Sequence, residues 1–148
     1  MINQSTRFAY FKEKMLEKIS TNHAVHQIGY HLVWCTKFRH NILVNGVDVI
    51  VKRTIGQACG NYGWHCKAIE IMPDHVHLFL QVHHTDSPVN VVKTLKSLTA
   101  VAVFCTFPKL KGKKFWGSGL WSRCTYYGSV GNVSQETIKQ YIASQKQK

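Results

Sequence analysis

Two histidines occupy alternate positions of an apolar run, in the stretch EIMPDHVHLFLQV from Glu70 to Val82. Alternate residues of a β-strand point to the same face of a sheet, so His75 and His77 would share one face. Two imidazoles at this spacing can hold one metal ion, or both can contact a phosphate group. The spacing equally fits two exposed histidines on a solvated strand face, in a chain that contains 9 histidines.

A second pair of chemical groups lies near the carboxyl end, in the stretch IKQYIASQ from Ile138 to Gln145. Tyr141 and Gln145 are four positions apart, so on a helix they would lie one turn from each other on the same side. The same stripe contains Ile138 and Ile142. The spacing therefore also fits a tyrosine that simply packs in the core.

The elements that must position these groups can be predicted from hydrophobic periodicity and turn residues. Strands rich in β-branched and aromatic residues are expected at about 27–35, 64–72, 75–83 and 122–130. One-sided helices are expected at about 46–59 and 88–104, the first stopped by Gly60 and Gly63 and the second begun by Ser87 and Pro88. Ser134 can cap a last helix that ends near residue 146.

This order predicts an α+β, ferredoxin-like βαββαβ fold, with an antiparallel sheet, helices on one face, and a C-terminal helix that carries Tyr141. The even residues of the third strand, Val76, Leu78, Leu80 and Val82, would face the helices, and the histidines would face the other side. At 148 residues the chain fits one domain. We expect that domain at 26–148, after an N-terminal extension at 1–25 with an amphipathic pattern near helical spacing from Phe8 to Ile19.

The charge of the chain points to a polyanionic partner. There are 19 Lys and Arg residues against 7 Asp and Glu residues, a formal net charge of +12, and after Asp86 the only acidic residue is Glu136. Such a field attracts nucleic acid, the commonest polyanion. The lysine-rich stretch KLKGKK at 109–114 also fits an ordinary solvated loop.

The cysteines and the apolar runs bear on the compartment. The 5 cysteines are odd in number and form no C-x-x-C pair, which predicts reduced packing residues rather than disulfides or a zinc knuckle. A zinc site using His65 or Cys66 is an alternative, but neither lies in a recognisable ligand pattern. No apolar run approaches the roughly 20 residues of a membrane span, and the N-terminus lacks the apolar core of a secretory signal. We therefore expect a cytoplasmic protein with no membrane partner.

Four stretches, taken together in order and spacing, resemble one family. They are GYHLVWCTKFRHNIL (29–43), IEIMPDHVHLFLQV (69–82), GLWSRCTYYGSVG (119–131) and IKQYIASQ (138–145). This set resembles the single-tyrosine HUH transposases of bacterial and archaeal insertion sequences, the TnpA-like family of the REP-associated tyrosine transposase superfamily. HUH denotes histidine, a bulky apolar residue and histidine, here His75-Val76-His77. The likeness covers about residues 26–146.

The resemblance implies a specific chemistry. His75, His77 and Gln145 would be ligands of a divalent metal, Mg²⁺ or Mn²⁺, and imidazole and amide ligands suit Mn²⁺ better. Tyr141 would be the nucleophile that attacks a DNA phosphodiester, giving a 5′-phosphotyrosine link and a free 3′-hydroxyl. The ester conserves the energy of the broken bond, so another 3′-hydroxyl can rejoin it without ATP.

The resemblance also implies partners. Members of the family act on single-stranded DNA with hairpins near the element ends, as homodimers whose sheets join and whose active sites are composite, and this function places the protein at the nucleoid. Candidate DNA contacts are Lys37, Arg39, Lys93, Lys96, Lys111, Lys113 and Lys114.

Further side chains have two interpretations each. Trp121, Tyr126 and Tyr127 could stack on bases, although core packing is the favoured interpretation. Asp74 could hold a histidine in place or could be only the acidic residue of the hairpin turn, and the turn role is favoured.

Three other functions are compatible with parts of the sequence. A ferredoxin-like sheet can bind nucleic acid without catalysis, although no signature of paired aromatics on adjacent strands is present. A domesticated relative could process genomic repeat hairpins instead of moving an element, and nothing in the chain separates it from a transposase. A hydrolytic metalloenzyme acting on small molecules fits the +12 charge poorly.

Overall fold

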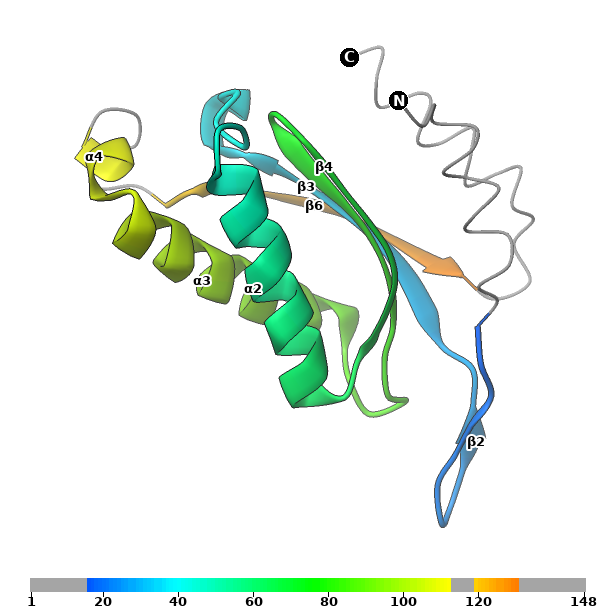
Figure 1. Cartoon of the computed structure of the whole chain (residues 1–148). Helices are drawn as coiled ribbons and strands as arrows, with labels where there is room; N and C mark the ends of the chain where they lie inside the picture. Colours follow the sequence, from blue (N-terminus) through cyan, green and yellow to red (C-terminus); the bar gives the residue numbers. More distant parts are fainter. Residues whose placement is uncertain (1–15, 113–118, 131–148) are drawn as a thin grey trace, which may run out of the picture.

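The computed structural model describes residues 16–112 and 119–130. Its elements are drawn in Figure 1. In chain order they are β1 (Ile19–Ser20), β2 (Val25–His26), β3 (Gly29–Thr36), the 3-10 turn η1 (Lys37–Arg39), α2 (Val47–Tyr62), β4 (His65–Met72), β5 (His75–Gln81), α3 (Pro88–Thr106), α4 (Pro108–Leu110) and β6 (Trp121–Val130). The four predicted strands and the first two predicted helices are all present, and the expected helix after Ser134 lies outside the described residues.

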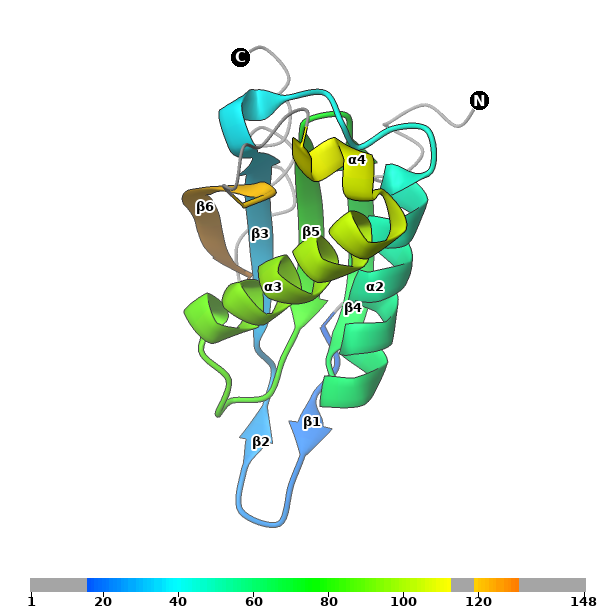
Figure 2. The same cartoon turned by 90° about the vertical axis from the view of Figure 1, so that its left-hand side faces the viewer.

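The central sheet has four strands in the order β4-β5-β3-β6, and every neighbouring pair is antiparallel. Helices α2 and α3 lie side by side over one face of this sheet, as Figure 2 shows. The β3-α2-β4-β5-α3-β6 order with β3 between β5 and β6 is the split βαβ arrangement. The predicted α+β, ferredoxin-like fold is confirmed.

The main core lies between the sheet and the two helices. Val76, Leu78 and Leu80 of β5 are fully buried there and belong to one apolar cluster with Val51 of α2 and Leu95 of α3. These β5 residues are the even set of the strand, so the prediction that they face the helices is confirmed. The odd set, which includes both histidines, consequently faces the other side of the sheet.

The helix ends follow the chemistry of the local sequence. The hydroxyl of Ser87 accepts a hydrogen bond from the Asn90 N–H at 3.1 Å, and Pro88 is the first residue of α3. Helix α2 continues through Gly60 and ends before Gly63, whose φ of 71° is a left-handed conformation. Gly60 does not stop the helix because a glycine inside a helix costs only about 1 kcal/mol, whereas a left-handed residue cannot continue it.

Helix α3 differs from one expectation. Among the described residues it is the one helix long and apolar enough, by length and composition alone, to cross a membrane. Its apolar side chains have another explanation, because Val91, Leu95 and Val103 are buried in the core against the sheet and α2. Core packing accounts for the buried face of the helix, whereas Val89, Leu98 and Val101 of the same helix are exposed.

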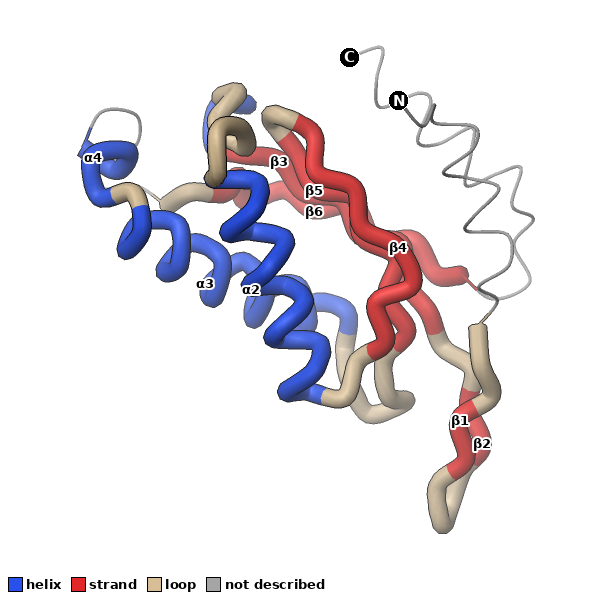
Figure 3. Tube along the Cα trace, in the orientation of Figure 1, coloured by secondary structure: helices blue, strands red, loops and turns tan. Residues whose placement is uncertain are grey.

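The segment before the sheet forms a separate two-stranded ribbon, seen in Figure 3 below the main sheet. In it Ile19 pairs with His26, so the helical spacing expected for the extension does not continue to Ile19. The residues just before the ribbon contact the histidine-bearing face: the Glu17 N–H donates to Gln81 Oε1 at 3.1 Å, and Gln81 Nε2 donates to the Glu17 carbonyl. Gln81 is fully buried, and these two hydrogen bonds pair both polar atoms of its amide.

Candidate functional site

Strand β5 places His75 and His77 side by side on the sheet face opposite the helices. Their ring centroids are 4.6 Å apart, with the rings edge to face, and the two residues are only 5% and 4% exposed. The interpretation of two histidines on a solvated strand face is therefore wrong. Burying an imidazole is costly unless its nitrogens find partners.

Asp74 holds the first of these histidines in one orientation. Its Oδ1 lies 2.5 Å from His75 Nδ1, and its Oδ2 accepts a hydrogen bond from Arg39 Nε at 3.2 Å. Burial alone would raise the pKa of Asp74, but the hydrogen bond to His75 and the charges of His75 and Arg39 bring it below the ordinary value. The carboxylate can therefore accept a hydrogen bond from a proton on Nδ1, and in the neutral ring this tautomer leaves the lone pair on Nε2.

His75 Nε2 is the ring nitrogen of this residue that is available to bind a ligand. It is buried and has no hydrogen-bond partner within the described residues. A buried nitrogen that carries a lone pair and whose ring is fixed by a carboxylate has the chemistry of a metal ligand. The favoured interpretation of Asp74 as only a turn residue is wrong: its carbonyl does accept from the Thr36 N–H at 2.9 Å, but its carboxylate positions His75.

We predict that Asp74→Asn weakens the binding of Mn²⁺ by about 10- to 100-fold, because the amide cannot hold the Nδ1 proton as an anion does. Isothermal titration of the whole chain with Mn²⁺ measures the change. Arg39→Gln is the matched control, because it removes the other partner of the same carboxylate and should alter the affinity much less. Equal losses in the two variants would contradict a specific effect on His75.

His31 of β3 is a third histidine on this face, and the sequence analysis missed it. Its ring stacks on His77 with centroids 5.9 Å apart, and the ring of Tyr126 meets it edge to face at 6.2 Å. Burial lowers the pKa of His31 to about 4, so the ring is neutral at pH 7. The sequence places His31 on the strand face of GYHLVWC opposite to Leu32 and Trp34. It does not show that Val33 pairs with His77, and this register brings His31 next to His77.

The neutral state of His31 predicts a pH-dependent stability. The unfolded chain, with an ordinary pKa of 6.5, binds more protons than the folded chain between pH 6.5 and about 4, so the free energy of unfolding rises with pH across this window. Above pH 6.5 the ring is neutral in both states and costs no stability. As the pH falls to about 4 and below, the free energy of unfolding decreases by at most about 3 kcal/mol. His26 acts in the same direction, because burial and then the nearby His84 and His83 lower its pKa.

Urea unfolding at pH 7 and pH 4.5, in the presence of a chelator, measures this dependence. His31→Gln should reduce the stability lost between the two pH values, and the same substitution at exposed His23 is the matched control. A His31→Gln protein that loses as much stability as the wild type would show that the burial of this ring is not responsible.

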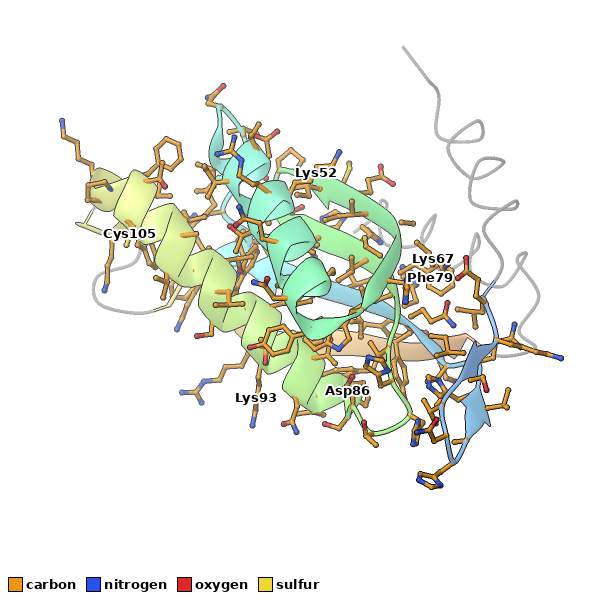
Figure 4. All side chains as sticks on the ribbon, turned by 60° about the horizontal axis from the view of Figure 1, so that its bottom comes forward. Lys52, Lys67, Phe79, Asp86, Lys93 and Cys105 are labelled. Carbon is orange, nitrogen blue, oxygen red and sulfur yellow. The ribbon has the colours of Figure 1, made fainter. Side chains whose placement is uncertain are left out.

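The basic residues proposed as DNA contacts are distributed over both sides of the molecule. Arg39 reaches the histidine site through Asp74, and Lys37 lies in the same turn, η1. Lys93 projects from α3 on the helical side, whereas Phe79, on the same strand face as the histidines, lies on the other side of the sheet (Figure 4). Lys113 and Lys114 lie outside the described residues.

Two other lysines of that set have intramolecular contacts. Lys96 Nζ donates to the Ser122 carbonyl at 2.9 Å, tying α3 to β6, and burial lowers the pKa of this ammonium group. Lys111 Nζ lies 5.5 Å from the centroid of the Phe104 ring. Within the described residues, Arg39 is therefore the cation of the set that contacts the histidine site through Asp74, and Lys37 lies in the same turn.

The aromatic side chains of β6 include both buried and exposed residues. Trp121 is buried, and its Nε1 donates to the Thr99 hydroxyl at 2.9 Å, so the prediction of core packing is confirmed for it. The same prediction is wrong for Tyr126 and Tyr127, which are 41% and 39% exposed.

The described residues bear on the cysteines and on the metal alternatives. All five cysteines are free, and the prediction that they are packing residues holds for buried Cys59 but not for exposed Cys105 and Cys124. No group of three or more His, Cys, Asp or Glu side chains in the described part of the chain is arranged to hold a metal ion. A metal at His75 and His77 would need a further ligand, and both Tyr141 and Gln145 lie outside the described residues.

Comparisons with known proteins bear directly on this site. The profile of the family described as "Transposase IS200 like" matches residues 24–145. The ISDra2 transposase TnpA of Deinococcus radiodurans is 36% identical over 124 residues, which cover 84% of this chain and 88% of that protein. The chain belongs to the IS200-like transposase family. It is therefore a transposase, an enzyme of DNA transposition, and the resemblance inferred from the four stretches is confirmed.

Solved structures support the same assignment of fold. A crystal structure of a protein from Deinococcus radiodurans R1 that is named as a transposase superposes on this IS200-like transposase with a TM-score of 0.72 and 34% identity, covering 86% of this chain and 97% of the other. A REP-associated tyrosine transposase bound to a REP hairpin has a TM-score of 0.56 at 13% identity, covering 87% of this chain and 67% of the other. The second likeness concerns the fold alone.

Proposed function

We propose that this transposase cuts and rejoins single-stranded DNA at insertion-sequence ends, in the nucleoid, by transesterification through a 5′-phosphotyrosine intermediate. Tyr141 is the nucleophile, and His75, His77 and Gln145 hold a divalent metal. The observation that carries the proposal is His75 Nε2, a buried lone-pair nitrogen with no hydrogen-bond partner in the described residues, on a ring that Asp74 orients and 4.6 Å from the ring of His77.

The donor set fits a divalent cation of intermediate hardness. Two imidazoles and an amide oxygen suit Mn²⁺ better than Mg²⁺, which prefers a shell of oxygen ligands. When bound, the cation supplies Lewis-acid chemistry, withdrawing charge from the phosphoryl oxygens and favouring the phenolate form of a nearby tyrosine.

The covalent steps exchange one phosphate ester for another. The Tyr141 phenol, with an ordinary pKa of about 10, loses its proton as its oxygen bonds to phosphorus, and the P–O bond to the 3′-oxygen breaks. The 3′-oxygen leaves as a hydroxyl. In the second step the 3′-hydroxyl of another strand attacks the phosphotyrosine and releases the phenol, so the number of ester bonds is unchanged and no nucleotide triphosphate is consumed.

We further propose that two copies form the active enzyme, with the domain at 26–148 as the catalytic unit of each. Strand β6, 10 residues long, is at one edge of the sheet and pairs only with β3 among the described strands, so its outer side offers free backbone groups for joining two sheets. The tyrosine helix of one copy then completes the histidine site of the other.

The test of the function is the formation of a covalent protein–DNA adduct. The whole chain is incubated with a single-stranded oligonucleotide that carries an end hairpin taken from the DNA flanking its gene, with Mn²⁺, and the products are separated under denaturing conditions. Two products are expected: the downstream fragment, linked to the protein through its 5′ phosphate, and the upstream fragment, which ends in a free 3′-hydroxyl. A chelator should prevent the formation of both. Cleavage that gives only free 5′-phosphate ends would show a hydrolytic nuclease and would overturn the proposal.

A further inference from the structure

The turn that follows β3 contains an unusual combination of backbone and side-chain features. Phe38 and Arg39 are consecutive non-glycine residues with positive φ, 55° and 52°. A left-handed conformation is uncommon for a bulky residue and costs about 1–2 kcal/mol per residue. Phe38 is also 73% exposed, the largest exposed fraction among the large hydrophobic residues of the described part. Neither backbone preference nor core packing accounts for this residue.

The turn is held in place from several sides. The Thr36 hydroxyl donates to the His40 carbonyl at 2.8 Å and so closes the turn. The Lys37 N–H donates to the Leu120 carbonyl at 2.9 Å, which ties the turn to the residue before β6. Arg39 Nε binds Asp74 at 3.2 Å, which ties it to the start of β5. The surrounding structure therefore keeps two strained residues in place and holds the ring of Phe38 in solvent, as is common at functional sites.

The groups around the exposed ring are basic. Lys37 Nζ lies 6.0 Å from the centroid of the Phe38 ring, the His40 ring meets it edge to face at 5.8 Å, and Arg39 is the next residue. The neighbouring carboxylate, Asp74, is already engaged by Arg39 and His75. An aromatic ring flanked by cations matches single-stranded DNA, whose bases offer flat faces and whose phosphates offer negative charge.

We propose that Phe38 is a stacking platform for an unpaired base of the DNA strand that is cut at the His75–His77 site. The identification of that strand rests on the proposed function, whereas the platform itself rests on the geometry of the turn. Asp74 connects the two, since one of its oxygens contacts His75 and the other contacts Arg39. A base on Phe38 is consequently held at a fixed position relative to the metal-binding histidine, and the platform helps to set which phosphate is cut.

The experiment measures the binding of a fluorescently labelled, hairpin-containing single-stranded oligonucleotide by anisotropy, with the whole chain and a chelator so that no cleavage occurs. Phe38→Ala should weaken binding by about 5- to 150-fold, the usual effect of removing one base-stacking aromatic. Phe38→Leu should weaken DNA binding to a similar extent, because leucine is apolar but has no flat face. Phe38→Trp should bind DNA at least as tightly as the wild type. Tyr62, 51% exposed at the end of α2, is the matched control, and Tyr62→Ala should bind as the wild type does.

Two further measurements separate stacking from a structural role. Abasic sites placed one at a time along the unpaired part of the oligonucleotide should reveal one position that weakens binding to the wild type but not to Phe38→Ala. Phe38→Gly should raise the urea midpoint of unfolding, because glycine accepts the positive φ, while weakening DNA binding. A Phe38 needed only for folding would give the opposite change in stability.

The outcomes distinguish this inference from the proposed function. If Phe38→Ala and Phe38→Gly bind DNA as the wild type does, or if the wild type does not bind single strands, the stacking platform is wrong whatever the adduct assay shows. If Phe38→Ala changes self-association instead of DNA affinity, the ring belongs to a protein interface and the inference is again overturned. Failure of the wild type to form an adduct counts against the proposed chemistry alone, since the binding assay needs neither metal nor Tyr141.

Discussion

Replacing Tyr141 with phenylalanine abolishes the covalent protein–DNA adduct, lowering its rate of formation by at least about 1000-fold, while the protein still binds single-stranded DNA. The reason is chemical: the substitution removes one oxygen atom, the one that would form the ester with phosphorus, and keeps the ring. The measurement is the yield of protein-linked DNA after denaturation, with the anisotropy assay run in parallel on the same preparation.

Tyr127→Phe is the matched control for this prediction. Tyr127 is a partly exposed tyrosine of β6 that also belongs to one of the four motif stretches, and its variant should form the adduct at the wild-type rate. An adduct of undiminished yield in Tyr141→Phe would move the nucleophile to another residue and would remove the transesterification mechanism as stated.

The second large effect is expected from the histidine pair. His75→Ala and His77→Ala should each lose at least about 100-fold in Mn²⁺ affinity and at least about 1000-fold in adduct formation, because each removes a ligand and metal binding supplies several kcal/mol to phosphoryl chemistry. Isothermal titration and the adduct assay measure the two losses. Far-ultraviolet circular dichroism checks the fold, since both residues are buried.

His65→Ala provides a control that also tests the zinc alternative. His65 is exposed at the start of β4, and its loss should leave both metal affinity and adduct formation unchanged. If metal binding instead depends on His65 and not on His77, the ligands have been misassigned, and the buried lone pair of His75 needs another explanation.

Mixing the two classes of inactive variant tests how the sites are shared. A protein lacking His75 and His77 and a protein with Tyr141→Phe should both be inactive alone. When they are mixed and allowed to exchange subunits, a mixed dimer has one intact site only if the tyrosine acts on the partner's histidines. Recovery of adduct formation therefore supports composite sites, and its absence in a demonstrated mixed dimer places the tyrosine and histidines in one subunit.

The fold was predictable because its signals are local. The alternation of Val76, Leu78 and Leu80 fixed the face of β5 that meets the helices, and Ser87 with Pro88 marked the start of α3. The end of α2 was less certain, since Gly60 and Gly63 are equivalent as letters and only the backbone angle at Gly63 distinguishes them. The apolar character of α3 was underestimated, because its exposed face carries apolar residues as well as its buried face.

The surroundings of the histidines were less predictable because they depend on long-range pairing. His31 reaches His77 only through the β3–β5 register, and Arg39 reaches Asp74 across 35 positions of the chain. Basic composition alone could not show which lysines contact DNA. The sequence does not distinguish a lysine whose ammonium group donates to a backbone carbonyl, such as Lys96, from one that is free. Patterns within one element are visible in a sequence, whereas contacts between elements require the tertiary fold.

The buried amide of Gln81 has a consequence for how related chains can begin. Both of its polar atoms are paired with the backbone of Glu17, so a protein that started after the ribbon would lose two hydrogen bonds to this amide, each worth about 0.5–1.5 kcal/mol. In a shorter homologue we expect either a different side chain at this position or a peptide from elsewhere that pairs with the amide. The leading segment and position 81 should vary together in evolution, because the two contact each other across the proposed domain boundary after residue 25.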